Sequence, residues 1–370
     1  MLTARHIDQI TSIAKQIAPD GGLHNPSVGD KEREYLNACI DTNEVSSVGA
    51  FVLQFEKMLR DYTGAKHAIP VVNGTAALTL ALKIAGVKPG DKVITQALTF
   101  IGTCNAIAAC GAVPVFCDVD LSTGGMSAES LSRLRGVHAS AIVPVDVMGF
   151  PCDIASIKET AEFHDLPNTI PVVEDAAEAL GSFSFGEHCG VSADVAILSF
   201  NGNKTITTGG GGAILTNNSE WADKARHLST QAKLPHRYEY EHDVVANNLR
   251  MPNINAALGC AQMERIDEIL AAKKYNFDQY KKIFDDAGIL YLHSICGAVW
   301  NHWLITFFAE DLCDRNRLLE EFNSRGVKAR PLWKPLNKYG PYSGCYSMPT
   351  PNAEWLYETA ICLPSGVRVC

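Results

Sequence analysis

The sequence predicts an α/β protein with two unequal domains. Short apolar strands alternate with helices over residues 65–216, a pattern typical of a mainly parallel sheet covered on both faces. After about residue 255 the alternation gives way to helical periodicity. The 370 residues, 46% of them hydrophobic, are enough for a large core. We therefore expect a large α/β domain over residues 1–254 and a smaller α+β domain over residues 255–370.

The N-terminal part of the chain is expected to be helical. Gly21 and Gly22 end the first apolar periodicity, and residues 42–49 read as a loop. The helices are expected over residues 1–20, 30–40 and 51–62.

The alternating region supplies the sheet. Strands are expected at residues 67–72, 92–95, 113–117, 141–145, 170–173, 195–199 and 213–216, with helices at 76–85 and 100–110. Ligands of such sheets bind at the carboxyl ends of the strands, so the chemistry is expected there.

The C-terminal part mixes helices and strands. Residues 255–284 read as one long helix or a kinked pair, 289–308 as strand-like, 315–324 as a helix and 330–337 as an irregular proline-rich stretch.

Composition excludes some function classes. A net charge of −9 without a long basic run gives no electrostatic support for nucleic-acid binding. The twelve cysteines are scattered rather than paired at metal-binding spacing, so we expect reduced thiols and no metal site. The N-terminus lacks an apolar signal core, and no apolar run approaches membrane-spanning length. These features predict a cytoplasmic protein.

Residues 199–212 are the most informative stretch. An apolar strand runs into Ser199, Lys204 follows in a small-residue turn, and four glycines come after it. The order is the reverse of a phosphate-binding Walker loop, in which the glycines precede the lysine. Lys204 therefore reads either as a positioned Schiff-base lysine or as a solvated loop lysine beside a flexible hinge.

Two further strand ends carry polar residues. Asn73, Gly74 and Thr75 form a turn that opens a helix, which suits a phosphate but is also a common structural feature. Asp175 follows a buried strand, where it either faces a cationic group or caps a helix. Phe100 lies at the start of another predicted helix, and its side chain either belongs to the hydrophobic core or covers one face of a flat ring.

Together these groups match the needs of pyridoxal 5′-phosphate. Its phosphate needs N–H and hydroxyl groups, its ring nitrogen needs an anion, and its aldehyde needs an amine. The sequence therefore predicts this cofactor.

The chain resembles the DegT-type nucleotide-sugar aminotransferases, which have the aspartate-aminotransferase fold (fold type I). The resemblance covers nearly the whole length through HAIPVVNGTAALTLAL, VVEDAAEALGS, SFNGNKTITTGGGGAILTNN, NLRMPNINAALGCAQMERID and ARPLWKPLN. SFNGNK and RPLWKPLN are most similar to the branch that aminates C4 of UDP-2-acetamido-2,6-dideoxy-4-ketohexose on routes to bacillosamine and legionaminic acid.

The resemblance implies a role for each cofactor residue. Lys204 would bind the aldehyde and move the proton, and Asp175 would pair with the ring nitrogen. The remaining cofactor contacts would be Gly74, Thr75 and Ser199 at the phosphate, Phe100 on the ring, Glu178 near the ring hydroxyl, and Asn248 reaching a second subunit's phosphate. A homodimer with active sites at its interface follows from the last contact.

The substrate residues are expected from the same resemblance and from chemistry. Arg330 and Trp333 would contact the diphosphate and the base. The other candidates are Ser47, His236, Arg237 and Asn301. Each of them alone reads equally well as a surface charge or a packed side chain.

The expected reaction transfers the amino group of L-glutamate to a UDP-linked 4-keto sugar and leaves 2-oxoglutarate. The alternatives are a GDP- or dTDP-linked keto sugar aminated at C3 or C4, a sugar dehydratase, a pyridoxal-phosphate-binding regulator, or an α/β binding protein without the cofactor.

Overall fold

A continuous, mostly parallel sheet forms the centre of the protein. The computed structural model describes residues 2–162 and 170–367. The strands are β1 (His67–Val71), β2 (Lys92–Gln96), β3 (Val113–Cys117), β4 (Ala141–Val143), β5 (Val173–Asp175), β6 (Phe183–Ser184), β7 (Glu187–His188), β8 (Val195–Ser199), β9 (Gly212–Thr216), β10 (Ala298–Val299), β11 (Ile305–Phe308), β12 (Arg330–Pro331) and β13 (Ala360–Leu363).

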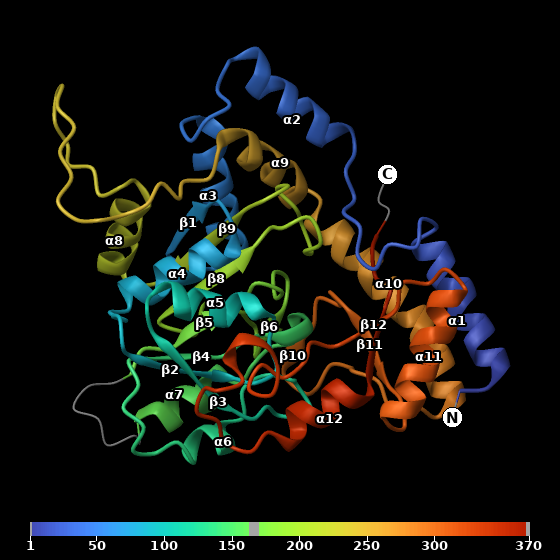
Figure 1. The fold of residues 1–370 in the computed structure, drawn as a ribbon. Helices are drawn as coiled ribbons and strands as arrows, with labels where there is room; N and C mark the ends of the chain where they lie inside the picture. The colour runs from blue at the N-terminus through green and yellow to red at the C-terminus, as the bar shows by residue number, and fades with distance from the viewer. Residues whose placement is uncertain (1, 163–169, 368–370) are drawn as a thin grey trace.

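The helices surround this sheet and continue into the C-terminal part (Figure 1). They are α1 (Ala4–Ile17), α2 (Asp30–Asp41), α3 (Ala50–Thr63), α4 (Gly74–Ile84), α5 (Ile101–Ala109), α6 (Ala128–Ser132), α7 (Ile154–Glu162), α8 (Ser219–Ser229), α9 (Asn253–Met263), α10 (Ile266–Ala287), α11 (Leu312–Ser324) and α12 (Pro351–Thr359), with 3₁₀ turns at Val147–Gly149 and Gly340–Tyr342.

The central sheet has the order β3-β2-β4-β5-β8-β9-β1. Two runs of strands, β3-β2-β4 and β5-β8-β9-β1, are joined by parallel bridges from Ile142 to Val172 and from Val145 to Asp175. β9 runs antiparallel to both of its neighbours, whereas β2, β3, β4, β5 and β8 are parallel. The prediction of a mainly parallel sheet is confirmed.

Apolar helix faces cover both sides of this sheet. On one side α4 packs its buried leucines and alanines, such as Leu78 and Leu82, against β8 and β9. On the other side α3 and α9 pack together around Phe55 and Cys260. Strand β8 is buried along Val195–Leu198, which explains its unbroken apolar sequence.

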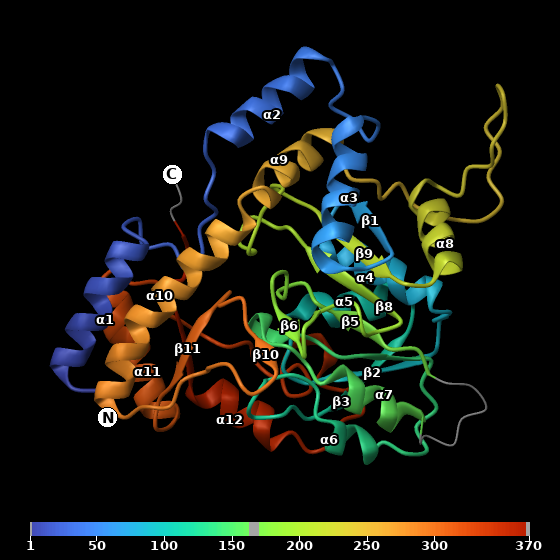
Figure 2. The same ribbon diagram turned by 180° about the vertical axis from the view of Figure 1, so that it is seen from behind.

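A smaller antiparallel sheet, β11-β13-β12, lies in the C-terminal part. Helices α1, α10 and α11 lie side by side next to it in Figures 1 and 2. Ile7 and Ile10 of α1 share a core with Phe277 and Phe284 of α10. That core also contains residues of the large sheet, so the boundary at residues 254 and 255 stays a prediction.

Several sequence-based expectations are refined. Residues 255–284 form the kinked pair α9 and α10, which breaks at Glu264 and Arg265. Residues 289–308 are strand only at β10 and β11, because the rest is irregular around Gly297 with its φ of +80°. The expected strand at 170–173 is shifted, since β5 runs to Asp175 itself. Helices α6, α7, α8 and α12 and strands β6, β7, β12 and β13 were not predicted, and β12 lies in the stretch 330–337 that was expected to be irregular.

The described cysteines are free thiols, most of them buried, as their scattered spacing predicts. Within residues 2–162 and 170–367, the helices are too short or too polar to cross a membrane.

Candidate functional site

A cavity of about 340 Å³ opens at the carboxyl ends of the central strands. The polar residues predicted from the sequence meet there: Gly74, Thr75, Asp175, Glu178, Ser199 and Lys204 all line it. Phe100, Trp303 and Trp333 supply its aromatic walls. The strand ends of the sheet bring together Asn73 and Lys204, which are 131 positions apart in sequence, as the strand-end rule for parallel sheets requires, and the C-terminal part adds Trp303 and Trp333.

Lys204 lies in the turn after β8 and is not a solvated loop residue. Its side chain is 13% exposed, and its Nζ lies 3.1 Å from Oε1 of Glu178. The same nitrogen lies 4.3 Å from the centre of the Trp303 ring, which the backbone carbonyl of Asn203 holds through the indole N–H at 2.7 Å. The hypothesis of a positioned lysine is therefore supported over that of a flexible hinge.

The last of the four glycines after Lys204 has a packing role. A Cβ on Gly212, the first residue of β9, would lie 2.6 Å from the backbone carbon of Asn73. Gly212 is paired with both Val71 of β1 and Ser199 of β8. The absent side chain thus allows three strand ends to meet beside the α4 turn.

The turn at the start of α4 is shaped for an anion. Asn73 caps the helix by accepting the Ala76 N–H at 2.8 Å. Gly74 and Thr75 are the first helical residues, whose N–H groups have no acceptor within the helix. A Cβ on Gly74 would lie only 2.8 Å from Cβ of Ser199, so glycine brings the helix start against the hydroxyl of Ser199. This cradle fits a phosphate group.

Asp175 ends β5 at the floor of the cavity. It is 6% exposed, and its Oδ2 accepts a hydrogen bond from the hydroxyl of Thr103 at 2.8 Å. Burial raises the pKa of its carboxyl group, and the Thr103 hydroxyl opposes that rise. The helix-capping alternative is wrong, because the residues that follow, 176–182, form turns rather than a helix. A buried carboxylate in this position fits a cationic ring nitrogen.

Phe100 lines the cavity and does not belong to the core. Its side chain is 54% exposed, and its ring meets Trp333 edge-on at 6.3 Å between centroids. The reading of Phe100 as a core residue is therefore wrong. Together with the phosphate cradle, Asp175 and Lys204, this free aromatic face makes the residues fit pyridoxal phosphate.

A second cavity, of about 330 Å³, adjoins the first. The two share Asn203, Trp303 and Trp333 as lining residues, and Arg330 stands in the wall of the second. The placement of Arg330 and Trp333 agrees with a substrate site beside the cofactor cavity.

Asn301 has a structural position in this fold. It is 2% exposed, and its Nδ2 donates to the carbonyl oxygens of Glu178 at 2.7 Å and Leu180 at 3.0 Å. Its Oδ1 accepts the backbone N–H of Trp303 at 2.9 Å. The side chain therefore holds the Glu178 and Trp303 segments together, and a substrate contact by Asn301 has no support from this geometry.

The other predicted contacts lie away from the cavity within this chain. His236 and Arg237 are on an exposed segment between α8 and α9 that projects from the body as a yellow loop in Figure 1. Asn248 is exposed where this segment returns to the body, bridged to Thr230. Ser47 is half-buried in the loop before α3. Their roles stay predictions.

Sequence reasoning missed Thr103 and Asn203. Thr103 lies on the first turn of α5, where threonine is common for structural reasons alone. Its role as a partner of Asp175 depends on β5 lying next to α5, which a local sequence pattern does not show. Asn203 acts through its backbone carbonyl, which a side-chain pattern does not reveal.

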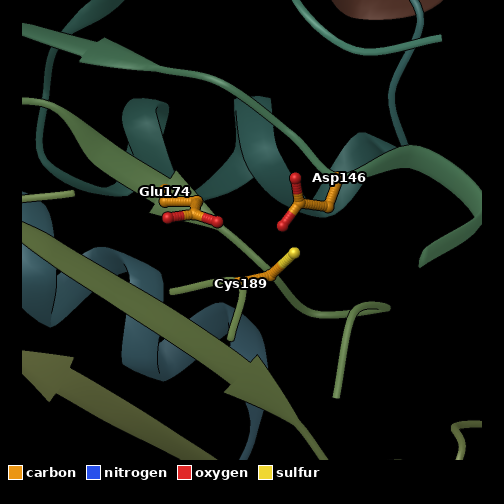
Figure 3. Close-up of side chains that lie close together, drawn as sticks. All are labelled: Asp146, Glu174 and Cys189. Carbon is orange, nitrogen blue, oxygen red and sulfur yellow. The ribbon is translucent and has the colours of Figure 1, made fainter. Parts of the chain in front are cut away.

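A buried cluster stands directly behind the site. Asp146, Glu174 and Cys189 point toward one another in Figure 3, and their ligand atoms all lie within 4.8 Å of one another. One oxygen of each acid accepts a backbone N–H at 2.8 Å, from Cys152 and Gly190 respectively. The other oxygens, Oδ2 of Asp146 and Oε2 of Glu174, have no hydrogen-bond partner.

A proton explains this arrangement without a metal ion. Burial raises the pKa of Asp146, with the neighbouring charge of Glu174 adding to the rise, and burial raises the pKa of Glu174 to about 7. Asp175 faces the pair as a further negative charge, and Lys158, the cation that acts on Glu174, is itself paired with Asp194 at 2.9 Å. A proton between the two acids satisfies both free oxygens and limits the negative charge behind Asp175.

Comparison with known proteins identifies relatives of the whole chain. A model described as the DegT/DnrJ/EryC1/StrS aminotransferase family matches residues 26–370. A GDP-perosamine synthase of Caulobacter vibrioides is 40% identical over 322 residues, covering 86% of this chain and 85% of that protein. A GDP-perosamine synthase of Escherichia coli O157:H7 is 36% identical over 344 residues, covering 93% and 92%.

The solved structures agree with these relatives. The PMP form of the putative sugar aminotransferase Spr1654 of Streptococcus pneumoniae superposes with a TM-score of 0.87 at 27% identity, covering 93% of this chain and 92% of that one. The predicted fold type I architecture is confirmed. The sequence-based assignment to the UDP-sugar branch is not confirmed, because the named relatives above are GDP-sugar enzymes.

Gly74→Ala tests the phosphate cradle. The added methyl group would force α4 away from Ser199, and such overpacking typically costs about 1–3 kcal/mol. We expect the affinity for pyridoxal phosphate to fall roughly ten-fold or more, measured by absorbance titration of the cofactor-free protein. Gly344→Ala, where a Cβ meets open space, is the matched control. Equal affinities in the two variants would contradict the cradle.

Asp146→Asn tests the shared proton. The unfolded chain releases the Asp146 proton near the ordinary pKa of 3.8, whereas burial and the charge of Glu174 raise the pKa of this carboxyl well above that value in the folded protein. The stabilisation is therefore fully present below pH 3.8 and is lost as the pH rises through the raised pKa of the folded protein. In the variant, the amide satisfies Glu174 without a proton, so we expect a flatter dependence of unfolding free energy on pH.

The measurement is urea unfolding at about pH 6 and about pH 8, between which the wild type should lose on the order of 1 kcal/mol more unfolding free energy than the variant. Asp278→Asn, on the exposed face of α10, is the control and should follow the wild type. A variant with the wild-type pH dependence would rule out the shared proton.

Proposed function

This chain belongs to the DegT/DnrJ/EryC1/StrS aminotransferase family and is a pyridoxal-phosphate-dependent sugar aminotransferase, and we propose that it aminates a GDP-linked keto sugar with L-glutamate as donor. The products would be the amino sugar nucleotide and 2-oxoglutarate. The single observation that carries the proposal is the meeting of Lys204 and Asp175 in one cavity beside an anion cradle.

The residues divide the work of the reaction. Bound pyridoxal phosphate supplies an aldehyde that carries the amino group and a protonated ring that withdraws electrons. Gly74, Thr75 and Ser199 would hold its phosphate, and Phe100 would cover its ring. Asp175 would hold the ring nitrogen in its protonated form by placing a buried negative charge against it.

Lys204 performs the proton transfer in this proposal. Its Nζ would hold the aldehyde end of the cofactor and, once released, would take a proton from the donor carbon and deliver it to the carbon that receives it. The enclosed position of Lys204, between Glu178 and Trp303, keeps the amine close to its target and away from bulk water.

The second cavity supports a nucleotide site. Arg330 offers a guanidinium group for the diphosphate, and Trp333, shared by both cavities, offers an aromatic surface for the base or sugar. We propose a guanine nucleotide because the named relatives at 40% and 36% identity are GDP-perosamine synthases. A UDP- or dTDP-linked sugar is the alternative that the substrate panel below separates.

We also propose a homodimer in which the segment 231–247 reaches the second copy. Tyr238 and Tyr240 on this segment are 77% and 81% exposed, and Val245 is fully exposed. Burial of these side chains against a second subunit would remove apolar surface from water. His236, Arg237 and Asn248 would then contact the second subunit's site, while Ser47 would lie near the sugar.

Lys204→Ala should abolish turnover. The variant lacks the amine that moves the proton, so the rate should fall by roughly three orders of magnitude or more. Borohydride treatment followed by peptide mass spectrometry should fix a pyridoxyl group on Lys204 in the wild type and not in the variant. Lys88→Ala, on an exposed turn, is the control and should retain both properties. A pyridoxyl group on another lysine would contradict the assignment.

A substrate panel tests the nucleotide. The protein is incubated with L-glutamate and 4-keto sugars linked to GDP, UDP or dTDP, and the products are measured by mass spectrometry. We expect the GDP sugar to be aminated with at least about a ten-fold higher kcat/KM than the others. Preferred amination of the UDP sugar would restore the sequence-based assignment, and 2-oxoglutarate formation without any amino sugar would exclude all three acceptors.

A further inference from the structure

Glu178 is the acid that contacts the amine of Lys204. Its Oε1 lies 3.1 Å from Nζ, and the two side chains are 6% and 13% exposed. Its Oε2 accepts the backbone N–H of Met148 at 2.8 Å, and its backbone carbonyl accepts Nδ2 of Asn301 at 2.7 Å. The Met148 N–H therefore fixes one carboxyl oxygen, the Asn301 amide fixes the backbone, and the other carboxyl oxygen is directed at the lysine.

The turn that holds Glu178 is strained. Met148 has a φ of +60°, a conformation that a non-glycine residue adopts at a cost of about 1–3 kcal/mol. This conformation belongs to the turn Val147–Gly149, from which the Met148 N–H reaches Oε2 of Glu178. The side chain of Asp146, just before the turn, accepts the N–H of Cys152 just after it. Backbone strain beside an active site is consistent with a functional demand on the position of Glu178.

The two carboxyl groups of the cavity have different partners. Asp175 is bonded to the Thr103 hydroxyl and the Ala177 N–H, so its oxygens are directed by α5 and its own turn. Glu178 instead shares a hydrogen bond with the reacting nitrogen. Burial raises the pKa of Glu178, while Lys204 and the Met148 N–H oppose that rise, and the nearby charge of Asp175 adds to it. Two carboxyl groups in different environments are typical of active sites in which one acid stabilises a charge and the other transfers a proton.

The amine of Lys204 needs such a partner. A free lysine side chain carries its proton at neutral pH, and in this cavity the ammonium group would face the carboxylate of Glu178 and the Trp303 ring. An ammonium nitrogen has no lone pair and cannot take a proton from carbon. The reaction therefore requires an acceptor for the surplus proton within hydrogen-bonding reach of Nζ.

We propose that Glu178 is a second catalytic residue, the proton partner of Lys204 in the transamination that the proposed function assigns to this site. When the amine is free, an N–H bond of the ammonium group breaks and an O–H bond forms at Oε1 of Glu178. The neutral amine would then take the proton from the donor carbon and deliver it to the carbon that receives it. Glu178 would return its own proton to Nζ once the amine is neutral again. The exchange moves one proton between two groups of the chain and involves no oxidation or reduction.

Glu178→Gln separates proton exchange from positioning. The amide keeps the size of the side chain and can still accept the Met148 N–H, but it cannot take a proton. General acid–base groups typically contribute 10²–10⁴-fold, so kcat should fall by about 10²-fold or more, with a much smaller change in KM for glutamate. The isotope effect with glutamate deuterated at its α-carbon should rise, because proton transfer becomes the slow step.

A second readout needs neither cofactor nor turnover. In cofactor-free protein, Oε1 of Glu178 accepts a hydrogen bond from Nζ of Lys204, so removal of this acceptor should leave the amine more available to an electrophile. Reductive methylation of Lys204 at neutral pH, followed by peptide mass spectrometry, should therefore be faster in Glu178→Gln than in the wild type. Glu187→Gln, at an exposed hairpin position, is the matched control and should behave like the wild type.

Glu178→Asp distinguishes a proton acceptor from a spacer. The shorter acid keeps an exchangeable proton and should recover part of the activity that the glutamine variant loses. A glutamine variant with a kcat within about three-fold of the wild type and an unchanged isotope effect would overturn the proposal. So would an aspartate variant no faster than the glutamine variant, because geometry alone would then account for the loss.

The glutamate half-reaction keeps this test independent of the sugar. The change in cofactor absorbance on adding glutamate alone reports the proton step at Lys204 in each variant. If the wild type makes this change and Glu178→Gln makes it equally fast, the role of Glu178 is wrong while the aminotransferase assignment stands. If the wild type makes it but aminates no nucleotide sugar, the proposed acceptor is wrong while the role of Glu178 remains supported by the half-reaction.

Discussion

The ion pair of Lys204 and Glu178 lies in a small polar cavity that is surrounded by a largely apolar protein interior. A buried amine is costly unless a carboxylate faces it, and a buried carboxylate is costly unless N–H groups or cations surround it. The sheet meets both demands by ending β5 and β8 at the same edge, so that Glu178 and Lys204 leave neighbouring strands toward one space. Trp303 closes this space from the C-terminal part. The position of the Lys204 amine therefore depends on how the C-terminal part of the chain packs against the central sheet.

The buried acids Asp146 and Glu174, which lie behind Asp175, also need partners that offset their charge. Asp175 has to remain negative to serve a cationic ring, yet Asp146 and Glu174 lie next to it in the core. A proton shared by these two acids removes one negative charge from that neighbourhood. The loop that begins at Asp146 then supplies the Met148 N–H to Glu178. One short loop therefore connects the electrostatics beneath Asp175 with the placement of the acid beside Lys204.

The sequence predicted the parts of the site that sit at strand ends. Lys204, Asp175 and the Asn73–Thr75 turn each follow an apolar run, and local pattern is sufficient to find them. The contact of Glu178 with Lys204 could not be predicted in this way, because it depends on the register of β5 against β8 and on the turn at Met148. Asn301 was predicted to contact the substrate, but its amide joins two buried segments. The motifs SFNGNK and RPLWKPLN predicted a UDP-linked sugar, whereas the named relatives at 40% and 36% identity are GDP-perosamine synthases, so these motifs do not decide the nucleotide.

The glycine contacts at Gly74 and Gly212 have a consequence for how a ligand enters. Because Gly74 has no Cβ, the start of α4 packs against Ser199, and because Gly212 has none, β9 packs against the backbone of Asn73. Gly212 also pairs with residues of both β1 and β8. The anion site at the start of α4 can widen only if hydrogen-bonded strands separate, so its shape does not depend on a bound ligand. Little conformational entropy is then lost on binding, and affinity for an anion can come from a few directed N–H groups rather than from many contacts.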